Sequence, residues 1–361
     1  MYLIITKNFP PEIGGMQNLM WGLTKNLSKR FMIKVFADHH INHENFDKKV
    51  SFSIERVGGI KLIRKYRKAY LINEFIKNNK NIKAIIVDHW KSLELIKTNK
   101  KKICLIHGKE INHPKGSNSN KRILKVLNST NNIISNSKYT KDLAINCGVD
   151  SNKITIINPG IDPAKEINKK TLEKTEKLLK GKSPRLVTVS RLDKRKNHEK
   201  VIMSLRNLKQ LYPNIIYICI GQGDEEENLK KLVKELNLQE QVIFFKDISN
   251  EFKNSLVFKT NIFVMPSIIY KKSVEGFGIA YVEAAQYGIP SIGGVDGGAA
   301  DAIEHQKTGL ICDGNNLDDI YSSINSMLEN KKYLEYGKSA KENSSKFQWN
   351  KVFEQYKEIL T

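Results

Sequence analysis

The feature that most constrains this chain is the alternation of short apolar runs with longer amphipathic stretches along most of its length. Short apolar runs are typical of buried strands, and the amphipathic stretches between them are typical of helices. Strands that alternate with helices favour parallel sheets with helices on both faces. With 361 residues, the chain is long enough for at least two domains of this kind.

The apolar runs form two series, separated by a polar, Lys-rich segment at 164–183 that we interpret as a linker with a helix. The first series predicts strands at 2–6, 32–37, 84–87, 103–106, 133–135 and 154–157. The second predicts strands at 186–189, 215–220, 242–245, 262–265, 291–292 and 309–311, with helices at 197–211, 225–236, 279–287 and 317–329. We therefore expect an α/β protein of two doubly wound, Rossmann-like domains, 1–163 and 184–345, that face each other across a ligand-binding cleft.

The net charge of +22 is distributed unevenly. Residues 1–170 contain 32 Lys and Arg against 13 Asp and Glu, whereas residues 171–361 contain 28 against 25. A compositional bias toward lysine can explain the total but not this asymmetry, which favours a polyanionic partner, either nucleic acid or an anionic membrane. The N-terminus lacks the pattern of a signal peptide, no apolar run is long enough to span a bilayer, and the four cysteines form no CxxC pair. We expect a cytoplasmic protein.

Two loops after predicted strands carry patterns that suit a phosphate. Gly14 and Gly15 precede a helix, so backbone N–H groups and the helix dipole can approach an anion. Arg191 follows a strand and Lys196 lies five residues later, so both side chains can converge on one diphosphate. Each pattern alone is equally compatible with an ordinary turn or a solvated basic loop. A bare GxG at 221–223 is the nearest approach to a dinucleotide fingerprint, and no P-loop is present, which disfavours dehydrogenases and P-loop enzymes.

A third loop places two carboxylates eight residues apart. Glu275 lies in a glycine-flanked loop, and Glu283 lies about a turn and a half inside the helix that follows. A loop carboxylate with free amides can hold sugar hydroxyls, and a helix carboxylate can accept hydrogen bonds from two ribose hydroxyls. The staggered placement disfavours a glycosidase, whose two carboxylates flank one bond. A glycine-rich turn at 293–298 follows the next strand and would narrow the site.

Taken together, these residues resemble the family 4 retaining glycosyltransferases (glycosyl transferases group 1), which have the GT-B fold. The family motifs are matched at Glu275 and Glu283 (E-x7-E), Arg191 and Lys196 (R-x4-K), Gly14 and Gly15, His107 and Gly108, and, with an inserted proline, a turn at 158–162. The resemblance covers essentially the whole chain and is strongest to phosphatidylinositol mannosyltransferases and their relatives. It implies that a C-terminal helix, 347–361, packs back on the first domain.

The resemblance also implies transfer of a hexose from a nucleotide-diphosphate sugar of the UDP-glucose or GDP-mannose type. Arg191 and Lys196 would neutralise the leaving diphosphate, so that neither a metal ion nor another cofactor is needed. Glu275 and three amides would hold the sugar, Glu283 the ribose, and His107 the reactive face of the sugar. The three amides are those of Gly276, Phe277 and Gly278, and the base would stack near Lys246 and Asp247. No nucleophile is evident at the anomeric carbon, so a same-face displacement with retention is implied.

Residues 60–76 predict a basic amphipathic helix in the first domain. Apolar residues fall at positions 60, 63, 66, 70 and 71, and the basic residues are Lys61, Arg64, Lys65, Arg67 and Lys68. Such a helix can pack its apolar side on the sheet of its own domain, or it can lie on a membrane. Relatives that act on lipids dock through a helix in this region. The resemblance therefore implies a peripheral enzyme on the inner face of the cell membrane, with a glycerolipid or lipid-linked glycan as acceptor.

Three alternatives remain open from the sequence. The acceptor can be a soluble molecule. The protein can be a nucleotide-sugar epimerase of the same fold, although an epimerase would need acid and base groups near the sugar and no acceptor site. The basic charge can serve nucleic acid, but no recognition motif with interleaved aromatic residues is present, so we expect no nucleic-acid partner.

Overall fold

The computed structural model describes residues 1–12 and 14–360. The chain divides into two compact units. Unit 1 contains Met1–Asp162 together with the chain from Gln348 onward, and unit 2 contains Pro163–Phe347.

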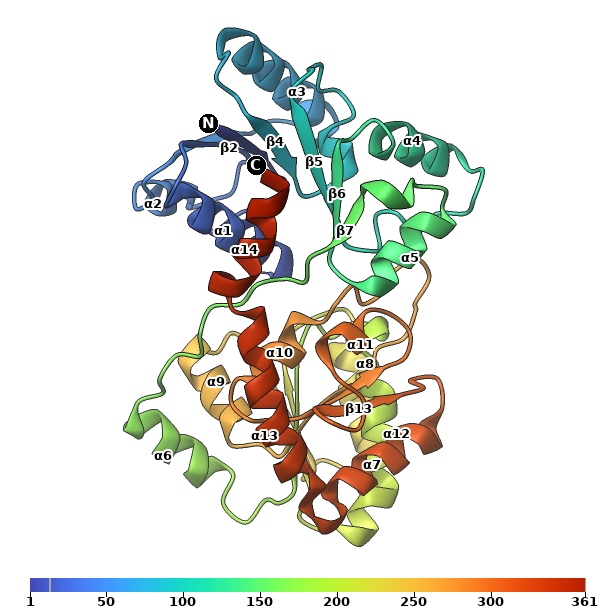
Figure 1. Ribbon diagram of the computed structural model, residues 1–361. Coiled ribbons are helices and arrows are strands. Elements are labelled where there is room, and N and C mark those ends of the chain that lie inside the picture. The colour runs from blue at the N-terminus through green and yellow to red at the C-terminus, as the bar shows by residue number, and fades with distance from the viewer. Residues whose placement is uncertain (13, 361) are drawn as a thin grey trace. The chain divides into compact units, whose positions relative to one another are not determined.

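Unit 1 is built on a seven-stranded sheet in the order β3-β2-β1-β4-β5-β6-β7, in which all neighbours are parallel (Figure 1). The strands are β1 (Tyr2–Ile5), β2 (Ile33–Asp38), β3 (Ser53–Val57), β4 (Ala84–Val87), β5 (Lys101–Ile106), β6 (Asn132–Ser135) and β7 (Ile154–Ile156). The main helices are α1 (Gly15–Ser28), α2 (His43–Asp47), α3 (Lys61–Asn78), α4 (Asn118–Leu127), α5 (Lys138–Asn146) and α14 (Trp349–Leu360). The strand order reverses between β1 and β4, which is the topology of a doubly wound domain.

Unit 2 is built on a six-stranded parallel sheet in the order β10-β9-β8-β11-β12-β13. The strands are β8 (Arg185–Val189), β9 (Ile216–Ile220), β10 (Val242–Phe245), β11 (Ile262–Met265), β12 (Ser291–Gly294) and β13 (Gly309–Cys312). The helices are α6 (Lys169–Leu178), α7 (His198–Leu211), α8 (Glu226–Glu235), α9 (Asn250–Phe258), α10 (Ile279–Ala285), α11 (Ala299–Ala302), α12 (Leu317–Leu328) and α13 (Lys332–Ser344). The segment at 164–183 is more than a linker, because α6 packs on α9 within this unit.

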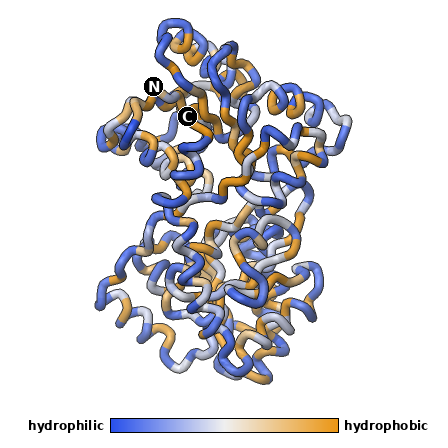
Figure 2. The backbone as a smooth tube through the Cα atoms, in the orientation of Figure 1, coloured by the Kyte–Doolittle hydropathy of each residue, from blue (hydrophilic) through white to orange (hydrophobic). Residues whose placement is uncertain are grey.

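The central strands are buried on both faces, which explains their continuous apolar runs. In β1, Tyr2 and Ile4 join a core with residues of α1 and α14, whereas Leu3 and Ile5 join a second core with residues of α3 and α4. Successive residues of a strand point to opposite faces of the sheet, so one strand supplies both cores. Figure 2 shows short hydrophobic segments alternating with hydrophilic ones along the backbone.

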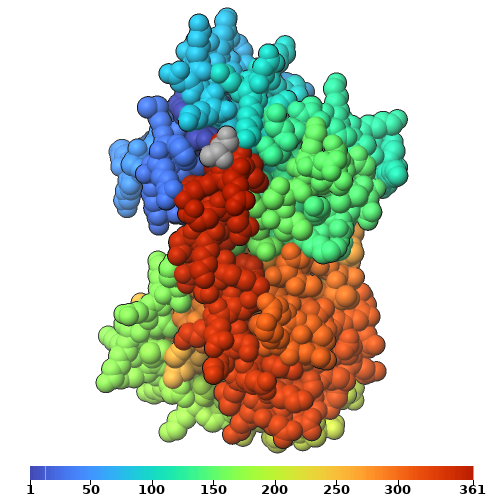
Figure 3. All heavy atoms as spheres, in the orientation of Figure 1, coloured from blue at the N-terminus to red at the C-terminus, as the bar shows by residue number. Residues whose placement is uncertain are grey.

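The C-terminal helix α14 belongs to unit 1 and packs on α1, where Figure 3 shows it in red. Two glycines make room for the Trp349 indole. A Cβ atom on Gly22 would lie 2.1 Å from Trp349 Cε2, and one on Gly160 would lie 2.4 Å from Trp349 Cδ2. The turn at 158–162 therefore has a packing role, in which its glycine receives the first residue of α14.

The expected fold class, two parallel-sheet Rossmann-like domains, is confirmed. Each strand predicted from an apolar run is present, but β3 was not predicted. This strand lies at the edge of the sheet, and only its last residue, Val57, is fully buried. An edge strand with polar residues at its centre produces no apolar run, and so the sequence pattern did not reveal it.

Candidate functional site

In unit 2, the loops with the candidate residues meet at one edge of the sheet. Strands β8, β11 and β12 are neighbours and run parallel, so the loops at their carboxyl ends lie side by side. Ligands of doubly wound domains bind at this edge. The loop after β8 carries Arg191 and Lys196, the loop after β11 leads to Glu275, and the turn after β12 contains the glycine-rich segment.

Glycines allow these loops to approach one another closely. A Cβ atom on Gly221 would lie 1.9 Å from the Ser190 carbonyl oxygen, and one on Gly223 would lie 2.3 Å from that of Leu192. The bare GxG at 221–223 therefore supports the loop after β8. In the same way, a Cβ atom on Gly297, whose φ is +129°, would lie 2.5 Å from the carbonyl oxygen of Glu275.

A short 3-10 turn, Lys194–Lys196, fixes the basic loop. The Asp193 carboxylate accepts a hydrogen bond from the Lys196 backbone N–H at 3.2 Å. The side-chain amide of Asn197 donates to the carbonyl oxygens of Pro266 and Gly314 at 2.9 and 2.8 Å. These contacts hold the basic loop against the loop after β11 and make its geometry well defined.

The centre of the site is a buried cluster of one carboxylate and two cations. Glu275 Oε2 accepts hydrogen bonds from Arg195 Nη1 at 2.6 Å and from Lys196 Nζ. Lys196 Nζ also contacts Met265 Sδ at 3.4 Å. The three charged side chains are only 10–12% exposed. Arg195 was not among the residues predicted from the sequence, although it lies in the same loop between the two that were.

Burial and charge compete at this cluster. Desolvation favours the neutral form of Glu275, but the adjacent Lys196 and Arg195 outweigh it and lower the pKa of the carboxyl to about 2. Desolvation also lowers the pKa of Lys196, an effect that the Glu275 charge opposes and the Arg195 charge reinforces. Glu275 is therefore ionised at neutral pH, and the cluster carries more positive than negative charge.

The other predicted donor-site residues lie on neighbouring elements without a direct contact to this cluster among the described residues. Arg191 is 71% exposed in its side chain and pairs with Asp193 at 2.9 Å. Glu283 is half-buried in α10. Burial raises the pKa of its carboxyl, and the positive charge of Lys253 acts in the opposite direction. Lys246 Nζ lies 3.8 Å from Glu226 Oε1, and the next residue, Asp247, has a backbone φ of 53°. Both come after β10, at the outer edge of the same sheet.

Gly276, Phe277 and Gly278 form the buried end of the Glu275 loop. The Phe277 ring packs edge-on against the Phe347 ring, with 5.4 Å between the ring centroids. Gly278 has a backbone φ of 90°, and the Tyr281 ring leaves no room there for a Cβ atom. The Tyr281 hydroxyl donates to the Met265 carbonyl at 2.6 Å. The loop is thus fastened to β11 through α10.

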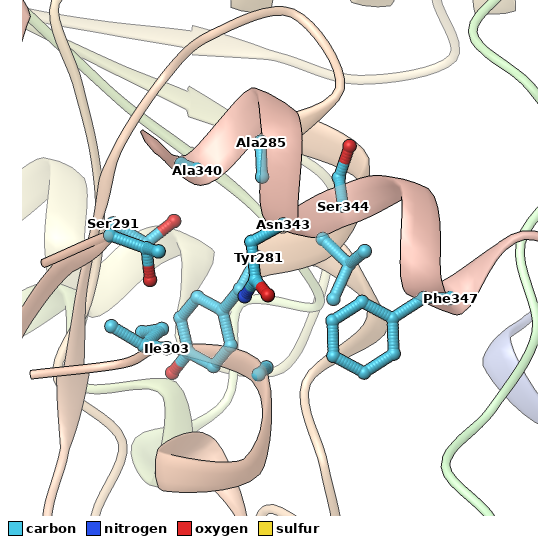
Figure 4. A pocket seen from close by; sticks show the side chains of 11 residues that line it. Tyr281, Ala285, Ser291, Ile303, Ala340, Asn343, Ser344 and Phe347 are labelled. Carbon is cyan, nitrogen blue, oxygen red and sulfur yellow. The ribbon is translucent and has the colours of Figure 1, made fainter. Parts of the chain in front are cut away.

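The small cavity behind α10 is not the site. Its volume is about 10 Å³, and its lining includes Tyr281, Ile303 and Phe347, as Figure 4 shows. The cavity has room for about one water molecule. Ser291 Oγ, which also lines it, is buried without a hydrogen-bond partner among the described residues. A sugar or nucleotide does not fit there.

In unit 1, a second polar cluster lies at the carboxyl edge of the sheet. Thr6 Oγ1 donates to Asp88 Oδ2 at 2.6 Å, and the His107 backbone N–H donates to Glu110 Oε1 at 2.5 Å. Asp88 Oδ1 and His107 Nε2 are buried and have no partner among the described residues. Desolvation lowers the pKa of His107 to about 4 despite the opposing influence of Asp88, so the ring is neutral at neutral pH.

The glycine pair lies at the start of α1, where Gly14 is the N-cap. Among the described residues, no side chain caps this helix end, and its first turn contains no acidic residue. The preceding loop is held by Arg56 of β3, which pairs with Asp47 through two nitrogens at 2.6 and 3.0 Å and donates to the Pro10 carbonyl at 2.5 Å. The predicted phosphate-binding loop is therefore anchored by a residue of the strand that the sequence pattern missed.

The predicted amphipathic helix is α3, but two of its basic residues do not face outward. Lys68 is buried, and its Nζ donates to Asp38 Oδ1 and the Thr6 carbonyl, both at 2.7 Å. Arg64 is partly buried and bonds to Asp38 Oδ2 at 3.3 Å and to the Gly59 carbonyl. The prediction that Lys68 faces a membrane is wrong, because the Asp38 carboxylate draws this lysine into unit 1.

The outer side of α3 is apolar and basic. Leu62 is 82% exposed, Tyr70 66% and Ile63 56%, and Ile60 and Tyr66 are also exposed. Lys61, Lys65 and Arg67 are exposed on the same helix. The residues that α3 buries are Lys68, Ala69 and Ile72. The helix packs Leu71, Ile72, Phe75 and Ile76 on its own sheet, whereas the apolar residues of its outer side have no such packing among the described residues. Within the described residues, no helix is both long and apolar enough to cross a membrane.

Comparisons with known proteins define the class of this one. The family described as Glycosyl transferases group 1 matches residues 169–346, and the family described as Glycosyltransferase Family 4 matches residues 13–165. The chain is a glycosyltransferase that uses a nucleotide sugar. It belongs to glycosyltransferase family 4, and its GT-B fold, expected from the sequence, is confirmed.

Individual relatives are distant but cover most of the chain. A GDP-mannose-dependent alpha-(1-6)-phosphatidylinositol monomannoside mannosyltransferase of Mycolicibacterium smegmatis is 24% identical over 348 residues, which is 90% of this chain and 88% of the relative. A Campylobacter jejuni N-acetylgalactosaminyltransferase that acts on a diphospho-undecaprenol glycan is 28% identical over 61% of this chain and 57% of its own length. The crystal structure of Anabaena HepE with UDP has a TM-score of 0.83 at 17% identity and covers 99% of both chains.

Proposed function

We propose that this enzyme transfers a hexose from a UDP-glucose- or GDP-mannose-type donor to a lipid acceptor at an anionic membrane surface, with retention of configuration and without a metal ion. The observation that carries the lipid acceptor is the exposed apolar and basic side of α3. The donor half of the proposal is supported by the charged cluster in unit 2. The proposal includes a location on the inner face of the cell membrane, which is supported by the resemblance to lipid-acting relatives.

In the donor half, cationic side chains stand where a diphosphate needs neutralisation. Lys196 and the exposed Arg191 supply these charges, so that no divalent ion is required to stabilise the leaving group. Glu275 is ionised and keeps one oxygen, Oε1, outside its ion pairs, where it can accept a hydrogen bond from a sugar hydroxyl. The carboxyl of Glu283, half-buried without an ion pair among the described residues, suits the two hydroxyls of a ribose.

In unit 1, His107 offers a hydrogen-bond acceptor to the reactive face of the transferred sugar. Its neutral ring has a buried Nε2 without a partner among the described residues, which can accept a hydrogen bond from a sugar hydroxyl. The uncapped start of α1, at Gly14 and Gly15, presents backbone N–H groups to an anion.

In the reaction we propose, the bond between the anomeric carbon and the diphosphate oxygen breaks, and the acceptor hydroxyl oxygen bonds to the same face of that carbon. The departing phosphate oxygen takes the proton of the acceptor hydroxyl.

The proposed membrane attachment is supported by the residues on the exposed side of α3. Leu62, Ile63, Tyr66 and Tyr70 recur at helical spacing on the side opposite the buried Lys68 and Ile72. Apolar and aromatic residues flanked by lysine and arginine are typical of helices that lie in the plane of a membrane surface. Two relatives, one named for activity on phosphatidylinositol monomannoside and one for activity on a diphospho-undecaprenol glycan, support a lipid acceptor here.

The test uses charge reversal on α3 with a matched control. The variant Lys61→Glu, Lys65→Glu, Arg67→Glu removes only outward-facing charges. The control changes three exposed lysines of unit 2 in the same way, namely Lys170, Lys177 and Lys180. At about 1 kcal/mol for each cation near the surface, the α3 variant should partition onto anionic vesicles more weakly by about a hundred-fold. Transfer to lipid in those vesicles should fall with it, while hydrolysis of the donor by water should change little.

Each result discriminates between proposals. If the α3 variant binds anionic vesicles and glycosylates lipid like the control, the helix is an ordinary surface element and the acceptor is soluble. If wild-type protein interconverts nucleotide sugars without any acceptor, the epimerase alternative holds. A panel of nucleoside diphosphates and their sugars in thermal shift identifies the base, since the ligand that binds best stabilises most.

A further inference from the structure

Glu275 has two cationic partners, although one would neutralise it. Arg195 Nη1 and Lys196 Nζ both bond to the same oxygen, Oε2. The two cations come from consecutive residues of one 3-10 turn, so that their side chains are presented to the carboxylate together. A buried carboxylate needs one compensating charge, and a second buried cation beside the first adds repulsion.

The two cations are not equivalent in their surroundings. Arg195 is held at its backbone, because its carbonyl oxygen accepts the Ile268 N–H at 3.0 Å. Its side chain is 10% exposed, and its Nε–H is buried without a partner among the described residues. The other side-chain contact of Lys196 is with the Met265 sulfur, a weak acceptor that costs little to leave. An ammonium on a flexible four-carbon stem moves more readily than a buried guanidinium.

Under the proposed function, Lys196 has two competing anionic partners. In the free enzyme it bonds to Glu275, and with donor bound it serves the diphosphate. When it moves to the diphosphate, Glu275 loses one of its two counter-charges while it remains buried. Without another cation, such a carboxylate would take up a proton and could no longer hold a sugar hydroxyl as an anion.

We infer that Arg195 is a positioning residue for Glu275: it retains the carboxylate in its ionised form and fixed orientation while Lys196 is released to the donor diphosphate. Arg195 keeps Oε2 occupied, so that Oε1 remains directed to the sugar. The inference rests on the proposed function, because it assigns a role within the donor site. It explains why two cations share one oxygen in the free protein.

The experiment compares the pH dependence of donor turnover in wild type and Arg195→Met. Loss of the guanidinium should raise the pKa of Glu275 in the donor complex, and the acid limb of the kcat profile should move to higher pH by about one unit or more. Arg195→Lys restores a charge and should bring the limb back toward the wild-type position. Lys194→Met is the matched control, because it removes an exposed charge from the same turn, and its limb should coincide with that of wild type.

A second measurement follows the proton without turnover. Calorimetry of nucleoside diphosphate binding in buffers of different ionisation enthalpy reports proton uptake. Arg195→Met should take up more protons on binding at mildly acidic pH than wild type and Lys194→Met do. Arg195→Gln provides the same readout if Arg195→Met does not fold.

The possible failures are distinguishable. If wild-type protein binds no nucleoside diphosphate and consumes no nucleotide sugar, the proposed function is wrong. If wild type is active, and the Arg195 variants show an unshifted acid limb and the wild-type proton stoichiometry at any level of activity, the role assigned to Arg195 is wrong. A loss of activity without a shift in pH dependence would mean that Arg195 only stabilises the loop.

Discussion

The two carboxylates of the E-x7-E motif should respond to the same substitution with opposite effects on stability. Glu275 is compensated by Arg195 and Lys196, whereas Glu283 has no ion pair among the described residues. Replacing each carboxyl by its amide keeps the shape and removes the charge. We expect Glu275→Gln to destabilise unit 2 at neutral pH and Glu283→Gln to leave it as stable or more stable.

The magnitude for Glu275 follows from its pKa. A pKa lowered from 4.5 to about 2 by folding corresponds to about 3 kcal/mol of stability at neutral pH. This contribution is present above pH 4.5, where the unfolded carboxyl is ionised, and is lost as the pH falls toward 2. For a unit of this size, about 3 kcal/mol should lower the Tm by roughly 6–12 °C. The Glu275→Gln deficit should therefore be full at pH 7 and shrink at acidic pH.

For Glu283 the sign is reversed. Burial raises the pKa of this carboxyl in the folded protein, so ionisation costs the folded state more than the unfolded state. The free energy of unfolding therefore decreases as the pH rises above 4.5, the unfolded value, and the amide removes this loss. The advantage of Glu283→Gln should grow from acidic to neutral pH and then become constant.

The assay is thermal denaturation of wild type and both variants between pH 2 and pH 8, with nucleoside diphosphate affinity measured by calorimetry at neutral pH. Glu283→Gln should lose affinity for the nucleoside diphosphate, because an amide accepts ribose hydroxyls less strongly, while Glu275→Gln should keep that affinity and lose sugar transfer. Equal losses of affinity in both variants would refute the division of roles. A stability loss of the same sign in both would refute the electrostatic reasoning.

Three further predictions concern the diphosphate site, metal ions and α3. Arg191→Met should lower kcat/KM by about a hundred-fold or more and leave the Tm unchanged, because the Arg191 side chain is exposed. Lys196→Met should lower kcat/KM at least as much. Steady-state kinetics and melting curves of the two variants check both expectations. Turnover should persist in excess EDTA, and complete loss that magnesium or manganese reverses would contradict metal independence. Lys68→Met should lower the Tm of unit 1 without changing vesicle binding, whereas Lys65→Met should weaken sedimentation with anionic vesicles at an unchanged Tm.

Sequence periodicity was sufficient for most of the fold because the sheets are parallel and buried on both faces. Strands such as β1 and β9 are buried along their whole length and appear as uninterrupted apolar runs. Periodicity does not reveal a strand that is not buried on both faces. At β3, the Glu55 side chain remains partly exposed, and Arg56 is buried through its bonds to Asp47 and the Pro10 carbonyl rather than through apolar packing.

For the site, spacing in the sequence identified the loops but not the pairing within them. The pattern R-x4-K selects Arg191 and Lys196, yet in the structure Glu275 is paired with Arg195 and Lys196, while Arg191 pairs with Asp193. The 3-10 turn and its Asp193 cap present Arg195 and Lys196 to Glu275, whereas Arg191, which precedes the turn, pairs with Asp193. A local charge pattern carries no information about a carboxylate 80 residues away.

The sequence pattern of α3 was incomplete for the same reason. A helical projection shows where the five cations lie around the helix axis, but it does not show which of them bond to residues elsewhere in unit 1. Asp38 ends β2, some 30 residues before Lys68, and the parallel sheet brings its carboxylate beneath the helix. The bonds to Asp38 bury Lys68 and partly bury Arg64, so that the outer side of α3 keeps an apolar stripe with three exposed cations. Attachment to a membrane through this surface should therefore depend on Leu62, Ile63 and Tyr66 as much as on charge. High salt should weaken the binding to anionic vesicles without abolishing it, because salt screens the three cations but leaves the apolar contribution intact.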